Sequence, residues 1–302
     1  MSDPATPRPR DPATAVPLAS VLARLGRLSI TARQAVEGLL AGQHRSVRRG
    51  LAVEFAGHRA YEPGDDLRRL DWAVSARSDR LVVRLDEEER RLRALLVLDA
   101  SGSMAYGTPS KWSVARTVGA AAAFLLVMQA DAVGLQPCGG NEDEPLAPGS
   151  TMGHLMRLFD RLDALSPAGP GPLAAAVLAA ARSLDRRGLL LVITDAFTEP
   201  GPLADACAFA RHRQHEVRVV QLVAPAEEVL SPTGTTEFIG LEGEGRRRLD
   251  ADRLRPYYQR DFQAHRAVLA ARLAAAGATL VQARSDQDPA NILALLTQAR
   301  RC

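Results

Sequence analysis

Short apolar runs alternate with longer helical segments from residue 95 onward, and this alternation constrains the fold more than any other feature of the sequence. Runs of strand length lie at 95–99, 132–136, 189–194, 217–223 and 279–283. Segments with helical character lie at 109–128, 151–165, 173–184, 202–213, 253–276 and 291–298. Buried strands separated by single helices are typical of a parallel sheet covered on both faces. The sequence therefore predicts an α/β fold of the Rossmann type, with a doubly wound, mostly parallel sheet.

The segments outside this alternation suggest how the chain is organised. Residues 1–17 are rich in proline and are expected to be a disordered tail. Residues 18–93 are expected to form a small helix-plus-β region, with helical spacing over 18–43 and strand-like runs at 51–55 and 80–93. Residues 94–302 would form the α/β domain, in which 226–250 make a β-hairpin that turns between Gly240 and Gly245.

Composition narrows the class of protein. With 46% hydrophobic and 24% charged residues, the chain is expected to be globular and soluble. A net charge of +3, with basic and acidic residues interspersed, argues against nucleic-acid binding. Three cysteines without metal-ligand spacing suit free thiols in a reducing compartment. No apolar run approaches the roughly 20 residues of a membrane helix and no signal peptide is recognisable, so we expect a cytoplasmic protein without a transmembrane segment.

A carboxylate and two hydroxyls follow the first predicted strand of the α/β domain. The stretch LLVLDASGSM contains Asp99, Ser101 and Ser103, and Asp195 follows another predicted strand. In a doubly wound sheet, ligands bind at the carboxyl ends of the strands, where the strand order reverses. Side chains two residues apart in an extended loop face the same way. If the two strands are neighbours, these four side chains form an all-oxygen site of the kind that Mg²⁺ prefers.

Two other interpretations of the same residues remain open. In the first, Ser101 and Ser103 are turn or cap residues that bond to nearby backbone N–H groups. In the second, the protein is a metal-dependent phosphohydrolase with Asp99 as its nucleophile. Haloacid-dehalogenase-like enzymes usually carry an acid at the position of Ser101, and a phosphate-binding lysine is missing, since Lys111 is the only lysine in the chain. Both facts weigh against the phosphohydrolase.

The motifs resemble those of two known groups. VLDASGSM is similar to the metal-ion-dependent adhesion site, D-x-S-x-S, of von Willebrand factor A domains. The upstream stretch EFAGHRAYEPGDDLRRLDWAVSAR resembles the bacterial domain of unknown function 58 family, in which such a segment precedes an A domain. The resemblance covers roughly residues 40–300 and implies a von Willebrand factor A-like fold. It also implies Asp99, Ser101, Ser103 and Asp195 as ligands of Mg²⁺ or Mn²⁺.

The second loop of the motif departs from the family pattern. It normally supplies a threonine, but in SPAGPGPLAAAV the corresponding position is Gly171. The nearest hydroxyl, Ser166, lies about five residues too early. The sequence therefore leaves open whether a cation binds, binds weakly or is absent.

The family resemblance implies a non-enzymatic interaction module or adaptor. Such proteins often accompany MoxR-type AAA+ ATPases, in complex assembly or metal-cofactor insertion, and the site would recognise an acidic side chain of a protein partner. In a further alternative the site is vestigial and residues 46–93 carry all binding. Their DDLRRLDW segment is either a docking surface or a clasp in which Trp72 packs the small region against the α/β domain.

Overall fold

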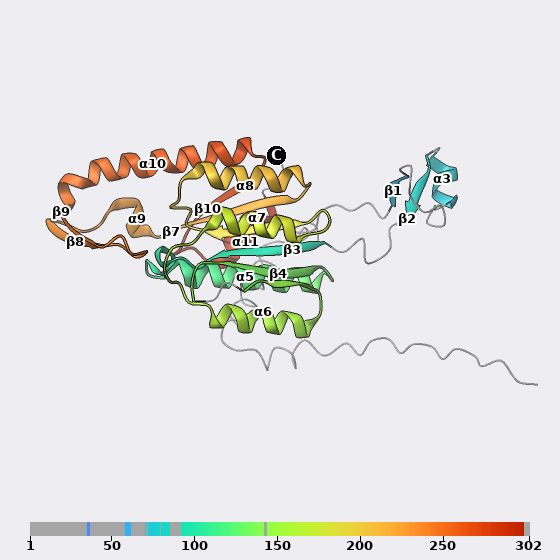
Figure 1. The fold of residues 1–302 in the computed structure, drawn as a ribbon, viewed down its shortest axis with the longest axis horizontal. Coiled ribbons are helices and arrows are strands. Elements are labelled where there is room, and N and C mark those ends of the chain that lie inside the picture. Colours follow the sequence, from blue (N-terminus) through green and yellow to red (C-terminus); the bar gives the residue numbers. More distant parts are fainter. Residues whose placement is uncertain are drawn as a thin grey trace, which may run out of the picture.

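Strand β3 (Arg93–Asp99) lies at the centre of the fold. The structure is a computed structural model that describes residues 35–36, 58–61, 70, 72–78, 80–84, 92–141 and 144–298. Within these residues the main sheet has the order β10-β7-β6-β3-β4-β5 (Figure 1). The other strands are β4 (Ala132–Cys138), β5 (Leu146–Gly149), β6 (Leu189–Thr194), β7 (Glu216–Val223) and β10 (Thr279–Arg284). All pairings are parallel except that of β5 with β4, so the mostly parallel α/β sheet is confirmed.

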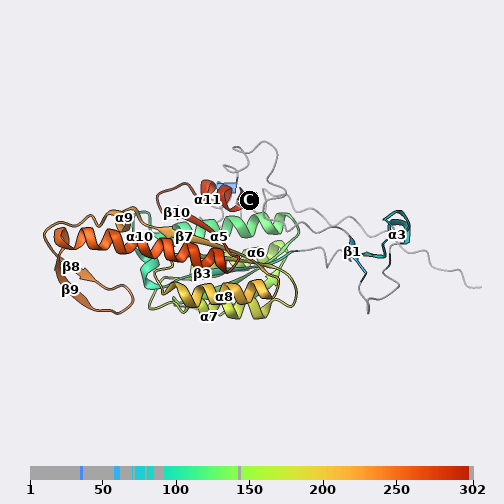
Figure 2. The same cartoon turned by 90° about the horizontal axis from the view of Figure 1, so that it is seen from above.

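Helices cover both faces of the sheet (Figure 2). One face carries α5 (Lys111–Met128), α6 (Met152–Ala164) and α11 (Pro289–Gln298). The other carries α7 (Leu173–Ser183), α8 (Pro200–His212) and α10 (Ala251–Ala275). Along β3, Ala94, Leu96 and Leu98 join the first core, whereas Leu95 and Val97 join the second. Burial on both faces is the reason that this strand reads as an uninterrupted apolar run.

The strand order reverses between β3 and β6. After β3 the chain builds β4 and β5 on one side, then returns to place β6 against the other side of β3. This is the switch point at which doubly wound sheets bind ligands. We call the end of the sheet at which β3 and β6 terminate the carboxyl edge. The sequence predicted that Asp99 and Asp195 converge if their strands are neighbours. Because β3 pairs with β6, this condition is met.

Several elements were not predicted from the sequence. Strand β5 has the sequence LAPG, which carries no alternating pattern, and it exists because β4 offers it a partner. The 3₁₀ helix η3 (Gly102–Ala105) follows β3, and helix α5 begins only at Lys111, capped by Ser110. A short helix, α9 (Pro225–Val229), precedes the predicted hairpin.

The predicted hairpin itself is confirmed. Strands β8 (Thr235–Ile239) and β9 (Arg246–Asp250) pair antiparallel. The Gly240 N–H donates to the Gly245 carbonyl at 2.8 Å, which closes the turn. We call residues 240–245 the hairpin tip.

The described part of the N-terminal region contains one small antiparallel pair. Strand β1 (His58–Ala60) pairs with β2 (Val82–Arg84), and α3 (Trp72–Ser78) lies between them in sequence. Trp72 is 65% exposed, which favours the docking-surface interpretation of the DDLRRLDW segment over the clasp. The tail at 1–17, the strand at 51–55 and most of the helix at 18–43 fall outside the described residues. The division at residues 93 and 94 stays a prediction.

Helix α5 is apolar enough to raise the question of a membrane span. By length and composition it is the one helix of the described residues that could cross a bilayer. In this structure 83% of it is buried inside the protein, and core helices meet the same criteria. The absence of a transmembrane segment therefore stays a prediction.

Asp131, which precedes β4, makes the stability of the fold depend on pH. Its Oδ1 accepts a hydrogen bond from the Leu92 N–H at 3.0 Å, while Oδ2 has no hydrogen-bond partner among the described residues. Burial raises the pKa of Asp131 from its usual 3.8 to about 6. Between these two values the folded chain holds a proton that the unfolded chain releases, so stability falls as the pH rises through this window.

We expect Asp131→Asn to remove this pH dependence, because the amide keeps an acceptor for Leu92 and carries no charge. At about pH 8 the variant should unfold with a free energy about 1–3 kcal/mol larger than that of the wild type, and at about pH 4 the two should be similar. Urea unfolding at the two pH values measures the difference. An equal difference at both would contradict the assignment.

Candidate functional site

The two predicted carboxylates meet at the carboxyl edge. Asp99 is the last residue of β3 and Asp195 directly follows β6, and both are buried. Asp195 lies close enough for its negative charge to contribute to the raised pKa of Asp99. The sequence-based expectation that they converge is therefore correct.

Asp99 is held by bonds from its own loop and from the neighbouring strand. Its Oδ1 accepts from the Ser101 N–H at 2.9 Å, and its Oδ2 accepts from the Thr194 hydroxyl at 2.6 Å. Burial, and then the charge of Asp195, raise the pKa of Asp99 to about 6, although the bonds from Thr194 and Ser101 oppose that rise. Thr194 was not foreseen, because a threonine inside an apolar strand gives no signal of its partner.

The two serines of the motif lie together, as their spacing predicted. The Oγ atoms of Ser101 and Ser103 are 3.1 Å apart and share a hydrogen bond. The backbone between them is fixed by the second loop, since the Gly102 N–H donates to the Gly169 carbonyl at 2.8 Å. The first and second loops of the motif are therefore in contact.

The only lysine in the chain lies inside the site. Lys111 is fully buried at the start of α5. Its Nζ donates to Asp195 Oδ2 at 2.7 Å and to Glu227 Oε1 at 2.5 Å. The same ammonium lies 4.8 Å from the centroid of the Phe197 ring. The sequence shows that Lys111 is the sole lysine but gives no indication of its role, because its partner Glu227 lies 116 residues away.

Glu227 belongs to the site as well as to α9. Its Oε2 accepts from the Ala224 N–H at 2.7 Å, which fixes the first turn of the helix. Burial raises the pKa of Glu227, and the ammonium of Lys111 opposes that rise. This carboxylate therefore ties α9, and the hairpin that follows it, to the carboxyl edge.

Gly171, at the position where the motif normally has a threonine, lies against Asp99 and Ser101. A Cβ at this residue would lie 3.0 Å from Asp99 Oδ1, 3.1 Å from Ser101 Cβ and 3.3 Å from Cys138 Sγ. The expected threonine would therefore not fit without movement of its neighbours. Ser166 does not replace it, since this residue is exposed to solvent and its N–H donates to Asn141.

The hairpin tip lies directly over the first loop. A Cβ on Gly102 would lie 2.1 Å from the Leu241 carbonyl oxygen, so the two backbones are in close contact. Glu242 Oε1 accepts from the Ser103 N–H at 3.4 Å. The charges of Asp99 and Glu242 both add to burial in raising the pKa of the Cys138 thiol. The hairpin was predicted, but its position over the motif was not.

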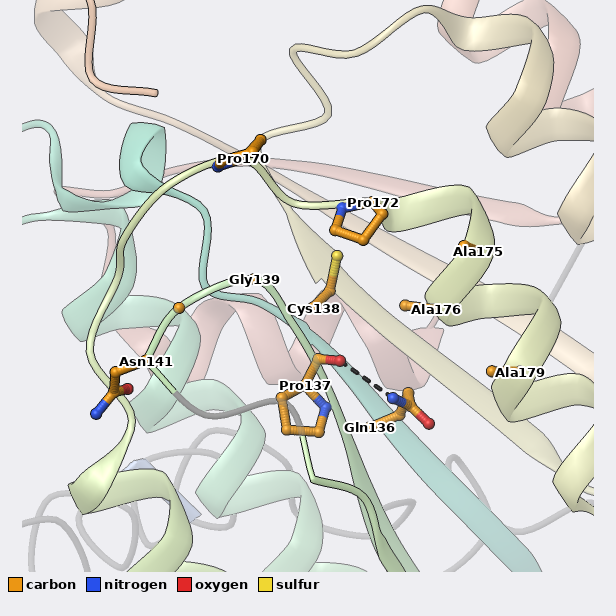
Figure 3. A pocket seen from close by; sticks show the side chains of 11 residues that line it. Gln136, Pro137, Cys138, Gly139, Asn141, Pro170, Pro172, Ala175, Ala176 and Ala179 are labelled. Atoms are coloured by element: carbon orange, nitrogen blue, oxygen red, sulfur yellow. Dashed lines mark hydrogen bonds between the residues drawn. The ribbon is translucent and has the colours of Figure 1, made fainter. Parts of the chain in front are cut away.

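A cavity of about 510 Å³ adjoins the site at the end of β4 (Figure 3). Pro137, Pro170, Pro172 and Ala176 supply much of its lining, and the Cys138 side chain points toward Pro172. None of the four predicted metal ligands lines it. The cavity is therefore a recess beside the site with a lining that is both polar and apolar, and Gln136 and Asn141 contribute to it.

The arrangement does not fit a divalent cation well. All four carboxylate oxygens of Asp99 and Asp195 already accept hydrogen bonds. The bonds to Asp99 and to Asp195 Oδ2 are described above, and Asp195 Oδ1 accepts from the Phe197 N–H at 3.3 Å. The positive charge beside them belongs to Lys111. The threonine ligand is absent, and a Cβ at Gly171 would lie within 3.0–3.3 Å of three neighbours, which would have to move to admit a side chain. The metal assignment of the four residues stays a prediction, and we derive no chemistry from it.

One argument against a phosphohydrolase has to be corrected. The lysine thought to be missing is present, since Lys111 lies at the carboxyl edge. Its ammonium is fully buried and paired with two carboxylates, so it does not face a space in which a phosphate could bind. The residue two positions after Asp99 remains a serine, which is a poor general acid.

Comparison with known proteins identifies relatives along most of the chain. Residues 57–268 match the family described as "Protein of unknown function DUF58". "Uncharacterized protein Mb1516" of Mycobacterium bovis and "Uncharacterized protein Rv1480" of Mycobacterium tuberculosis are both 32% identical to this chain over 286 residues. In each case the match spans 92% of this chain and 90% of the relative.

Solved structures give more distant likenesses. The conserved hypothetical protein BatB from Bacteroides thetaiotaomicron is 19% identical, with a TM-score of 0.49, over 69% of this chain and 96% of that one. The SpRpn10 VWA domain is 12% identical, with a TM-score of 0.42, over 67% of this chain and 94% of that one. The α/β architecture rests on the strand order described above and not on these likenesses.

The close packing at Gly171 predicts the outcome of a simple substitution. Gly171→Ala places a methyl group against Asp99, Ser101 and Cys138, and should lower the free energy of unfolding by about 1–3 kcal/mol. Gly153→Ala is the matched control, since a Cβ there meets no atom within 4 Å. In helix α6 that change should be neutral or stabilising by about 0.5–1 kcal/mol. Chemical unfolding of both variants measures this, and equal effects would contradict the described packing.

Proposed function

Since the chain belongs to the DUF58 family, we propose that it is a non-enzymatic protein-interaction module that binds its partner at the carboxyl edge. The proposal is supported by the position of the motif residues at the switch point of the sheet, where doubly wound folds bind their ligands. It is also supported by the burial and pairing of the charged groups, which leave hydrogen-bond donors, and not a reactive nucleophile, facing the hairpin tip.

One observation carries this proposal. An acidic side chain of the chain itself, Glu242, already lies against the first loop and accepts from the Ser103 N–H. The first loop therefore offers a backbone donor in a position where a carboxylate can reach it. A partner that presents an aspartate or glutamate could take the same place.

In this mechanism the partner competes with the hairpin tip. Glu242 is only half-buried, and its bond to Ser103 is long at 3.4 Å, so displacing it costs little. Beneath the tip, the N–H of Ser103 and the one serine hydroxyl that does not donate to the other supply donors for an incoming carboxylate. A hydrogen bond to a charged group contributes about 1.5–3 kcal/mol, enough to favour an acidic ligand over a neutral one.

The proposed partner is a MoxR-type AAA+ ATPase, and the proposed role is that of a cytoplasmic adaptor in complex assembly or cofactor insertion. This part of the proposal follows from the family resemblance. The exposed Trp72 on α3 favours a second contact in the N-terminal region, because large exposed aromatic side chains are common at interaction surfaces.

We expect Glu242→Gln to strengthen binding to a purified MoxR-type AAA+ ATPase by about 3- to 10-fold. The amide keeps the shape of the tip but competes less well with the partner's acid. Glu237→Gln is the matched control, because Glu237 lies in the same hairpin and makes only exposed pairs with Arg246 and Arg248. Titration calorimetry measures both affinities. Equal changes in the two variants, or no binding by the wild type, would refute this proposal.

An assay of phosphoester hydrolysis tests the enzymatic alternative. We expect the wild type and Asp99→Ala to release no more nitrophenol from p-nitrophenyl phosphate, with Mg²⁺ present, than buffer does. The reason is that no lysine faces an open space beside Asp99 and that Ser101 is a poor proton donor. Turnover by the wild type that disappears in Asp99→Ala would instead identify Asp99 as a nucleophile.

A further inference from the structure

Lys111 is a fully buried charge, and such a charge needs compensation. Taking an ammonium out of water costs several kcal/mol unless nearby groups stabilise it. Here two carboxylates lie within hydrogen-bond distance, and the face of the Phe197 ring lies 4.8 Å away. Aromatic faces attract cations, and more strongly when the cation is desolvated. The site is therefore built around a positive charge.

The partners of this charge come from separate parts of the chain. Asp195 follows β6 in the centre of the sheet, and Glu227 lies on α9, which leads into the hairpin. Lys111 itself begins α5, on one face of the sheet. One ammonium thus joins a helix, the switch point and the base of the segment that covers the site.

The family resemblance places a divalent cation beside Asp195 and Asp99. In this structure the ammonium donates to Asp195, one of the two predicted acidic ligands, and the other predicted ligand, Asp99, is satisfied by Ser101 and Thr194. A cation that arrived from solution would have to compete with an ammonium that is covalently attached and hence present at a high effective concentration.

We propose that the ammonium of Lys111 is the resident cation of the carboxyl edge and takes the charge-balancing place that the resemblance gives to a divalent metal. Folding of the α/β domain then needs no divalent ion. This inference goes beyond the proposed function, because it concerns the charge balance of the free protein and holds whichever partner binds.

Thermal unfolding in chelator, in Mg²⁺ and in Mn²⁺ tests this inference without any partner. The wild type should melt at the same temperature in all three. Lys111→Met, which keeps the length of the side chain and removes its charge, should melt lower by on the order of 10 °C in chelator. It should then regain part of that loss as Mn²⁺ is added, because Asp195 and Glu227 are left without a counter-charge.

Arg218→Met is the matched control. Arg218 is also a buried cation, paired with Glu216 at the start of β7, at the opposite end of the sheet. Its replacement should lower the melting temperature but should create no response to Mn²⁺. A Mn²⁺ response in this variant too would show that the ion acts on any exposed carboxylate and would overturn the assignment.

A third variant decides the matter if Lys111→Met does not fold. The combination Lys111→Met, Asp195→Asn and Glu227→Gln removes all three charges and nearly conserves their shapes, so it should fold and melt alike in chelator and in Mn²⁺. Failure of this variant to fold would overturn the proposal, since charge would then not be the reason that Lys111 is needed. A saturable Mg²⁺ or Mn²⁺ shift of the wild type that Asp99→Ala abolishes would also overturn it.

Discussion

The parallel pairing of β3 with β6 is the contact on which the rest of the carboxyl edge depends. Its register aligns Leu98 with Ile193, so Asp99 and Asp195 follow this pair by one and two residues and lie at the same edge of the sheet. Two buried carboxylates this close repel each other, and burial disfavours their charged forms. The Thr194 hydroxyl and the Lys111 ammonium offset this cost. The hydrogen bonds and the ion pair of the site thus stabilise two buried carboxylates that the pairing of β3 with β6 brings together.

Apart from β5, the strands of the main sheet were predictable from the sequence, because their cause is local. Strands β3 and β6 are buried on both faces, so they appear as apolar runs, and the helices between them fix their parallel direction. The meeting of Asp99 with Asp195 followed from that topology. The role of Lys111 could not be predicted in the same way, since its bond to Glu227 joins positions 116 residues apart and leaves no periodic pattern.

The motif also shows how a sequence signature can persist while its surroundings change. Asp99, Ser101 and Ser103 keep the spacing of an adhesion site, and Gly171 was correctly identified as the point of departure. Sequence comparison could not show that a side chain at Gly171 would lie tightly against Asp99, Ser101 and Cys138. Nor could it show that the predicted hairpin packs over the serines. The position of the hairpin depends on contacts between distant residues, such as that of Leu241 with Gly102.

The burial of Ala35 and Val36 bears on which piece of the chain can fold by itself. Both are helical and at most 5% exposed, and both belong to the apolar core that α5, α6 and α11 share. A fragment that begins at Leu92 would keep every strand of the main sheet but would leave the apolar surface beneath these two residues open to water. The part of the chain needed for independent folding therefore extends further toward the N-terminus than the sheet does, and further than residues 57–268, which match the family model.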